Sequence, residues 1–158
     1  MSNPLAIATD LTAARLLASD GPMGDGAIDN LVISSDVHVV TGVLVLVTLA
    51  ASVIWVGRLA VTRAPIDRVA IGLLIATEVC LMIQALLGIK LLDQGSGFGQ
   101  LYIHYIGGLI PVGLFIVAGW MGWRRIGRSA TPLAAVVGGG ALSAVMAFAI
   151  GQAYVNSL

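Results

Sequence analysis

Charged residues and cysteines are scarce in this chain, and each scarcity excludes a class of protein. Only 10% of its 158 residues are Asp, Glu, Lys or Arg, whereas soluble domains carry about 25%. The formal net charge is zero, so the composition indicates no nucleic-acid partner. The single cysteine, Cys80, excludes an intramolecular disulfide. No CxxCH sequence occurs, which excludes covalent c-type attachment of haem.

Apolar sequence is abundant instead. Hydrophobic residues make up 58% of the chain, and the mean hydropathy is +1.00. A helix needs about 20 consecutive, mostly apolar residues to cross a bilayer. Four runs reach this length, namely 37–56, 69–92, 102–123 and 132–155. We therefore predict an all-α membrane protein whose residues 37–158 form a four-helix transmembrane bundle, up-down-up-down, surrounded by the lipid bilayer.

Residues 1–36 form a more polar head before the first run. This head lacks the basic start and the apolar core of a signal peptide. Spaced apolar residues such as Leu5, Leu11 and Leu17 could form one weak apolar face. We expect an extracytoplasmic segment that allows a short helix on the membrane surface.

The basic residues predict the orientation in the membrane. Six of the eight lie in two short loops, after the first and the third run: Arg58, Arg63, Arg68, Arg124, Arg125 and Arg128. The aspartates, in contrast, occur mainly in the head and at the start of the 93–101 loop. By the positive-inside rule the arginine loops are cytoplasmic. We expect a multi-pass protein of the plasma membrane with both termini outside.

The only two histidines occupy equivalent positions. VHVVTG opens the first run and IHYIGG opens the third, so His38 and His104 are each followed by a glycine four positions later, Gly42 and Gly108. Residues i and i+4 share one helix face, which predicts a strip without side chains below each imidazole. Two imidazoles at one depth, each above such a strip, are what bis-histidine ligation of a haem iron requires. The pattern therefore predicts a haem b site near the outer face.

Simpler roles remain open for the same residues. A histidine near the membrane interface often hydrogen-bonds only a neighbour or water, and glycine is frequent in membrane helices. Zinc fits less well because it takes three or four ligands, and a di-iron site needs several inward carboxylates, whereas only Glu78 lies inside the membrane.

A family resemblance supports the haem interpretation. The segment LMIQALLGIKLLDQGSGFGQLYIH, which ends at His104, resembles the central part of one half of haem A synthase. The segment HVVTGVLVLVTLAASVIW resembles the earlier histidine-bearing helix of that half. The resemblance covers about residues 36–123 and implies that His38 and His104 are axial haem ligands. It also implies that Gln84 and Gly88 mark the helix between them.

The chain departs from that family at the catalytic position. The catalytic half of haem A synthase has a glutamate four residues before a ligand histidine, where this chain has Ser34 and Gln100. Only one half is present, and its extra helix follows the histidine pair. We therefore expect a haem-binding type of bundle and no haem A synthesis.

Three other polar residues in the apolar runs have two interpretations each. Glu78, near mid-membrane, is a candidate proton-relay group or a structural acid bonded within the bundle. Gln84 could contact a cofactor edge or bridge two helices. Lys90 could pair with a haem propionate, or extend to water beside Asp93.

Two functions follow from these observations. The first is a small b-type-cytochrome-like protein that holds haem through His38 and His104 and transfers electrons within or beside a respiratory complex. The second is a haem-free accessory subunit of a larger membrane complex, in contact with other membrane subunits. An enzyme is not expected under either hypothesis.

Overall fold

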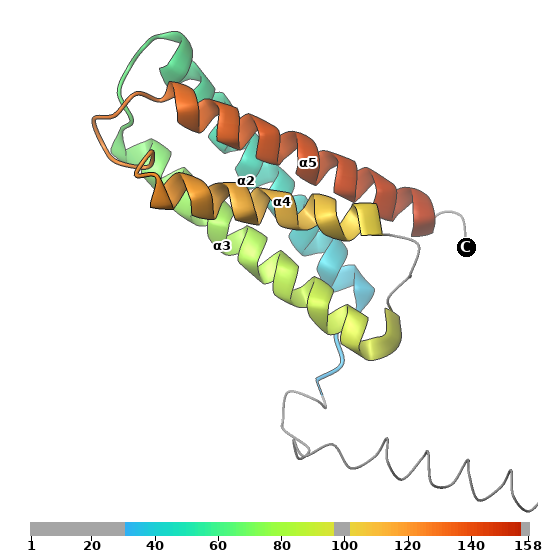
Figure 1. The fold of residues 1–158 in the computed structure, drawn as a ribbon. Helices are drawn as coiled ribbons and strands as arrows, with labels where there is room; N and C mark the ends of the chain where they lie inside the picture. Colours follow the sequence, from blue (N-terminus) through green and yellow to red (C-terminus); the bar gives the residue numbers. More distant parts are fainter. Residues whose placement is uncertain (1–30, 97–101, 156–158) are drawn as a thin grey trace, which may run out of the picture. The chain divides into compact units, whose positions relative to one another are not determined.

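The computed structural model describes residues 31–96 and 102–155, and the predicted surface helix of the head lies outside these residues. Four long helices and one short π-helix make up the described part, and no strand occurs in it (Figure 1). They are α2 (Ser35–Val61), α3 (Arg68–Leu91), η1 (Leu92–Ser96), α4 (Tyr102–Trp120) and α5 (Thr131–Val155). All four α-helices are long and apolar enough to cross a membrane. The prediction of a four-helix transmembrane bundle is confirmed.

Polar caps define where α2 and α3 begin. Ser34 precedes α2, and its hydroxyl accepts a hydrogen bond from the amide of Asp36. Asp67 precedes α3, and its carboxylate accepts from the amide of Ala70 at 2.7 Å. Such caps satisfy amides that have no partner inside the helix. Both helices therefore begin slightly before the apolar runs that predicted them.

The bundle consists of two equivalent helical hairpins, α2–α3 and α4–α5. Each buried residue of α4 lies 66 positions after a buried residue of α2, in the pairs Val45 and Pro111, Leu49 and Phe115, and Ser52 and Ala118. Each buried residue of α3 lies 63 positions before a buried residue of α5, in the pairs Ala70 and Leu133, Leu74 and Val137, Thr77 and Gly140, and Leu81 and Ala144. Residues at equivalent positions of the two hairpins thus face one shared core.

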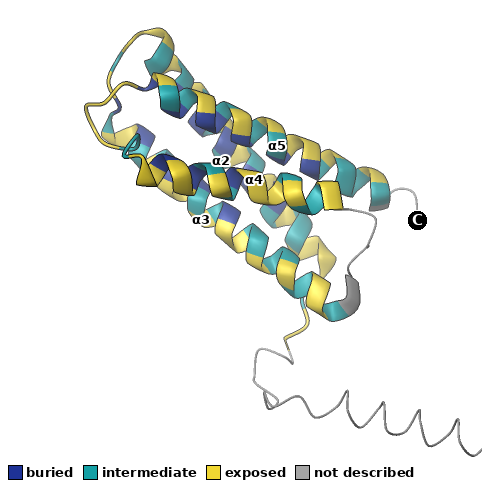
Figure 2. Cartoon of the chain, viewed as in Figure 1, coloured by how far each residue is buried: buried dark blue, intermediate teal, exposed yellow. Residues whose placement is uncertain are grey.

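The helices are not packed equally on all sides. α2 packs on both α3 and α5, and α4 packs on α5, while α3 and α4 contact one another far less. Buried residues follow the inner faces of the four helices, and exposed apolar residues cover their outer faces (Figure 2). Since outward apolar side chains are stable only in an apolar solvent, the described bundle is that of a multi-pass membrane protein.

Hydrogen bonds between helices satisfy polar groups in the middle of this bundle. The hydroxyls of Ser52 and Thr77, both fully buried, lie 2.9 Å apart between α2 and α3. Pro111 lies inside α4 and has no amide hydrogen for the carbonyl of Gly107, four residues earlier. The hydroxyl of Ser143 in α5 donates to that carbonyl at 2.7 Å. An unsatisfied carbonyl is costly in lipid, so this bond compensates for the proline.

Candidate functional site

The two histidines meet in the interior at one end of the bundle. Their ring centroids lie 6.3 Å apart, with an angle of 65° between the ring planes. His38 lies in the first turn of α2 and His104 in the first turn of α4, at equivalent positions of the two hairpins. Both rings are partly buried. The pairing of two distant histidines follows from the antiparallel order of the helices.

His104 is held by the backbone of α5. Its Nδ1 atom lies 2.7 Å from the carbonyl oxygen of Ala147. A carbonyl only accepts, so Nδ1 carries the proton and donates it, which leaves Nε2 unprotonated. No hydrogen bond within the described residues engages Nε2. This is the tautomer in which metal-ligating histidines are usually fixed.

Gly151 leaves the space in α5 that lets the ring of His104 reach the carbonyl of Ala147. A Cβ atom at position 151 would lie 3.0 Å from Cε1 and 3.1 Å from Nδ1 of His104. A helical carbonyl points toward the residue four positions later, so the missing side chain at 151 exposes the oxygen of Ala147. No local pattern in the sequence marks Gly151, because its role depends on a neighbour 47 positions away in the chain.

His38 is held by a side chain, Gln84 of α3. The amide nitrogen of Gln84 lies 3.1 Å from Nε2 of His38, and the amide oxygen accepts a short hydrogen bond from Thr41. In this arrangement Nε2 accepts and the proton lies on Nδ1. Nδ1 is buried, and it has no hydrogen-bond partner in the described part of the chain. A buried donor without an acceptor costs about 1–3 kcal/mol.

Gln84 can hold either tautomer of His38. Its amide carries both a donor and an acceptor, and the hydroxyl of Thr41 can also act as either. When the amide oxygen faces His38, Nε2–H donates to it and Nδ1 is left with an unshared electron pair. Gln84 therefore bridges α2 and α3, as the sequence allowed, and it accommodates either tautomer of a candidate ligand.

Two further glycines adjoin His38 and Gln84. A Cβ atom at Gly88 would lie 3.3 Å from Cε1 of His38. A Cβ atom at Gly42 would lie 3.3 Å from the amide nitrogen of Gln84 and 3.4 Å from the ring of Phe148. Gly88 and Gly151 thus have equivalent roles, since each lets an imidazole lie against the next helix of its hairpin.

Gly108 does not join this group. It is exposed, and nothing lies within 4 Å of a Cβ atom built there. The glycine that faces α5 is its neighbour Gly107, where a Cβ atom would lie 3.3 Å from the Cβ of Ala147. His104 leans toward α5, and on that side of α4 the next residue along the axis is i+3 rather than i+4. The strip without side chains that was expected at Gly108 therefore lies at Gly107 instead.

Lys90 and Glu78 have partners of their own. Lys90 forms an ion pair with Asp93 at 2.5 Å. Glu78 forms an ion pair with Arg124 at 2.7 Å, which joins α3 to the segment that follows α4. This ion pair was not predicted from the sequence. Gly119 adjoins this ion pair, since a Cβ atom there would lie 3.6 Å from the guanidinium of Arg124.

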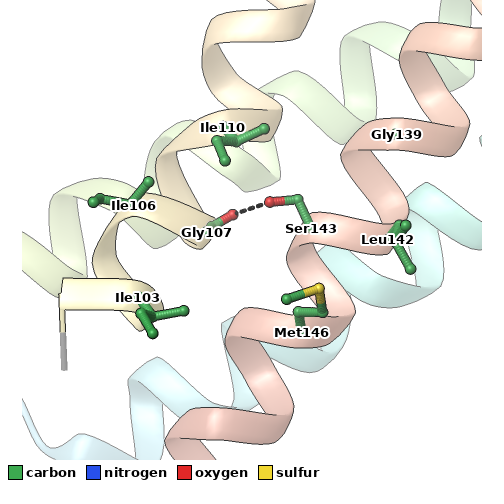
Figure 3. A pocket seen from close by; sticks show the side chains of 8 residues that line it. All are labelled: Ile103, Ile106, Gly107, Ile110, Gly139, Leu142, Ser143 and Met146. Atoms are coloured by element: carbon green, nitrogen blue, oxygen red, sulfur yellow. Dashed lines mark hydrogen bonds between the residues drawn. The ribbon is translucent and has the colours of Figure 1, made fainter.

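A separate groove of 290 Å³ lies on the outer side of α4 and α5. Figure 3 shows its apolar walls and, on its floor, the hydrogen bond from Ser143 to Gly107. The lining residues are Ile103, Ile106, Gly107, Ile110, Gly139, Leu142, Ser143 and Met146. Neither histidine lines this groove, so the polar site and the groove are distinct.

The spacing of the imidazoles matches that of two rings bound to one metal ion. Bonds of about 2.0 Å from a metal to one nitrogen of each ring would set the centroids about 6 Å apart in a linear geometry. The observed separation is 6.3 Å. No cluster of three or more His, Cys, Asp or Glu side chains occurs in residues 31–96 and 102–155, so the site does not offer the ligand set that zinc prefers.

No protein-family model, no curated protein and no solved structure matches this chain.

Proposed function

We propose that this protein binds a b-type haem between His38 and His104 and carries single electrons through it. The observation that carries the proposal is the 6.3 Å separation of the two ring centroids at equivalent places of the two hairpins. Bound haem supplies an iron that is oxidised and reduced by one electron at a time. The chain's own contribution is to hold the two rings through Ala147 and Gln84, which leaves Nε2 of His104 and Nδ1 of His38 as the candidate ligand atoms.

The hydrogen bonds around the rings support this proposal. The carbonyl of Ala147 fixes His104 with Nε2 unprotonated. Gln84 accommodates the tautomer of His38 that leaves Nδ1 unprotonated, and Nδ1 is the buried atom that lacks a partner in the described chain. Groups that orient a ligand through its second nitrogen are typical of metal-binding histidines.

A haem-free accessory subunit of a larger membrane complex, such as a respiratory one, is the second candidate. The contact that favours it is the network of Thr41, Gln84 and His38, which already bridges α2 and α3. Phe148, packed beside Gly42, further fills the interior near Gln84. Such a subunit would contact its partners through the exposed apolar faces of its helices.

An optical spectrum separates the two candidates. The full chain, purified in detergent from haem-replete cells and titrated with hemin, is expected to show a reduced b-type α-band. His38→Ala and His104→Ala should each abolish the band or convert the haem to a high-spin form. The matched control Ile103→Ala removes an exposed side chain next to His104 and should leave the spectrum unchanged. Absence of a reduced b-type α-band under both conditions would refute the haem proposal.

We also propose that both termini are extracytoplasmic in the plasma membrane, on the basis of the arginine loops. Single cysteines at Ser19 and Ser129, in a Cys80→Ala background, test this with an impermeant thiol reagent. In intact cells the cysteine at 19 should be labelled and the cysteine at 129 protected. The reverse pattern would invert the orientation and move the histidine site to the cytoplasmic side.

A further inference from the structure

The two arginine-bearing loops form a single surface at one end of the bundle. The amide of Ile66 donates to the carbonyl of Arg128, and the amide of Gly127 donates to the carbonyl of Ile66, both at 2.9 Å. Pro65 and Ser129 form an antiparallel bridge. The side chain of Ile66 is 1% exposed and anchors this contact in the core. We call residues 58–68 and 121–130 together the arginine platform.

Most of the positive charge on the arginine platform is not neutralised. Its six arginines are Arg58, Arg63, Arg68, Arg124, Arg125 and Arg128. Arg124 is paired with Glu78. The nearby carboxylate of Asp67 accepts from the amide of Ala70 and from the indole of Trp55. The other five arginines are exposed, and within the described residues none forms an ion pair.

Aromatic and aliphatic residues surround these arginines. Trp120 is 87% exposed, Val61 is 86% exposed and Ile126 is 61% exposed. Trp55 lies at the same end, with the guanidinium of Arg58 5.6 Å from its ring centre. Tryptophan is enriched at the level of lipid headgroups. We therefore expect the guanidinium groups to lie at the level of the phospholipid phosphates.

We propose that the arginine platform binds the phosphate groups of anionic phospholipids in the leaflet that it faces. Guanidinium groups bind phosphate oxygens through two parallel hydrogen bonds. Several unpaired arginines attract a lipid of net negative charge more strongly than a zwitterionic lipid, whose own cation neutralises the phosphate. The exposed apolar residues beside them favour a ligand that also carries acyl chains over a soluble phosphate.

Lipid preference of the purified full chain tests this proposal. Thermal unfolding in detergent is followed while dioleoyl-phosphatidylglycerol or dioleoyl-phosphatidylcholine is added, with inorganic phosphate and glycerol 3-phosphate as soluble controls. The anionic lipid should act at a mole fraction at least fivefold lower than the zwitterionic one. Its effect should weaken in about 0.5 M salt, where the screening length is only a few ångströms. The soluble phosphates should have no comparable effect.

Variants locate the effect on the arginine platform. Arg63→Asn, Arg125→Gln and Arg128→Gln in combination should reduce the preference to less than twofold. Asparagine is chosen at 63 because that residue has a φ of 55°, a conformation that asparagine tolerates. The single variants Arg125→Gln and Arg128→Gln should each lose part of the preference for the anionic lipid. They keep the test decisive if the triple variant does not fold. Lys90→Gln, at the opposite end of α3, should leave the preference unchanged.

Three results would overturn the proposal. Equal responses to the two lipids would show that the exposed arginines do not select charge. A soluble phosphate as effective as the anionic lipid would assign the site to a free anion. A preference that persists in the single and triple variants would place lipid binding elsewhere on the protein.

Discussion

The hydrogen bond from Ser143 to the carbonyl of Gly107 can be tested by a double-mutant cycle with Pro111. Ser143→Ala removes the hydroxyl that donates at 2.7 Å. The carbonyl then has no replacement, because Pro111 lacks the amide that would normally bond it. Hydrogen bonds between membrane helices contribute about 0.6 kcal/mol on average and up to about 1.7 kcal/mol. We expect a loss of about 1–1.5 kcal/mol in the free energy of unfolding, toward the upper part of that range.

Pro111→Ala supplies the second arm of the cycle. An alanine at 111 carries an amide that can bond the carbonyl of Gly107 within α4. Pro111 is also buried, and a Cβ atom at Gly140 would lie 3.6 Å from the proline Cβ, so the substitution costs some packing. The cycle cancels that cost. In the Pro111→Ala background, Ser143→Ala should therefore cost only a few tenths of a kcal/mol.

Steric trapping or unfolding in mixed micelles measures these free energies. The expected coupling between positions 111 and 143 is about 1 kcal/mol, or roughly a fivefold change in the unfolding equilibrium constant. Equal costs of Ser143→Ala in the two backgrounds would refute the reasoning. They would mean that the carbonyl of Gly107 is satisfied in another way, and that the serine contributes only through its size.

Three other predictions follow from the same contacts. Gly151→Ala should displace His104, since the new Cβ atom would lie 3.0 Å from the ring, and should weaken hemin binding at least tenfold by titration. Gly108→Ala, with open space around it, is its control and should bind hemin normally. Glu78→Gln should lower the free energy of unfolding by about 1–2 kcal/mol, because Arg124 loses its partner, without changing the visible spectrum. A further Arg124→Gln should recover part of the loss, and an additive loss would contradict the pairing. The amide of Ala70 and then the indole of Trp55 hold the pKa of Asp67 below its usual value. Its ionised form therefore stabilises the fold above about pH 4, the usual carboxyl pKa, and this contribution is lost as the pH falls further. Thermal unfolding of Asp67→Asn should be less sensitive to acid than that of the unaltered chain. Identical acid profiles would show that Asp67 does not contribute to the loss of stability in acid.

Several features of the candidate site could be predicted from the sequence. His38 and His104 follow the same local pattern at the same distance from an arginine, so their equivalent depth is a consequence of helix rise alone. The structure agrees with an equivalent depth of the two histidines, since their ring centroids lie 6.3 Å apart. The bridging role expected of Gln84 is also present. Whether haem is bound stays a prediction.

Other features depended on the rotation of each helix about its own axis. Gly108 and Gly107 are adjacent in sequence, but only Gly107 faces α5. The contributions of Gly151 and Ala147 to the site of His104 have no sequence signal beyond the presence of small residues. The ion pair of Glu78 with Arg124 likewise joins segments whose relative rotation no local pattern specifies.

Hydropathy along the chain determined that four helices span the membrane, where they lie and which residues share a depth. These properties depend only on helix length and rise, and each can be derived from a single segment. The tertiary structure alone decided which face of each helix points inward. In a soluble helix the polar face reveals this rotation, whereas these helices are apolar toward the core and toward the lipid alike. Packing of small residues between neighbouring helices fixes the rotation instead, and that packing exists only once all four helices are assembled.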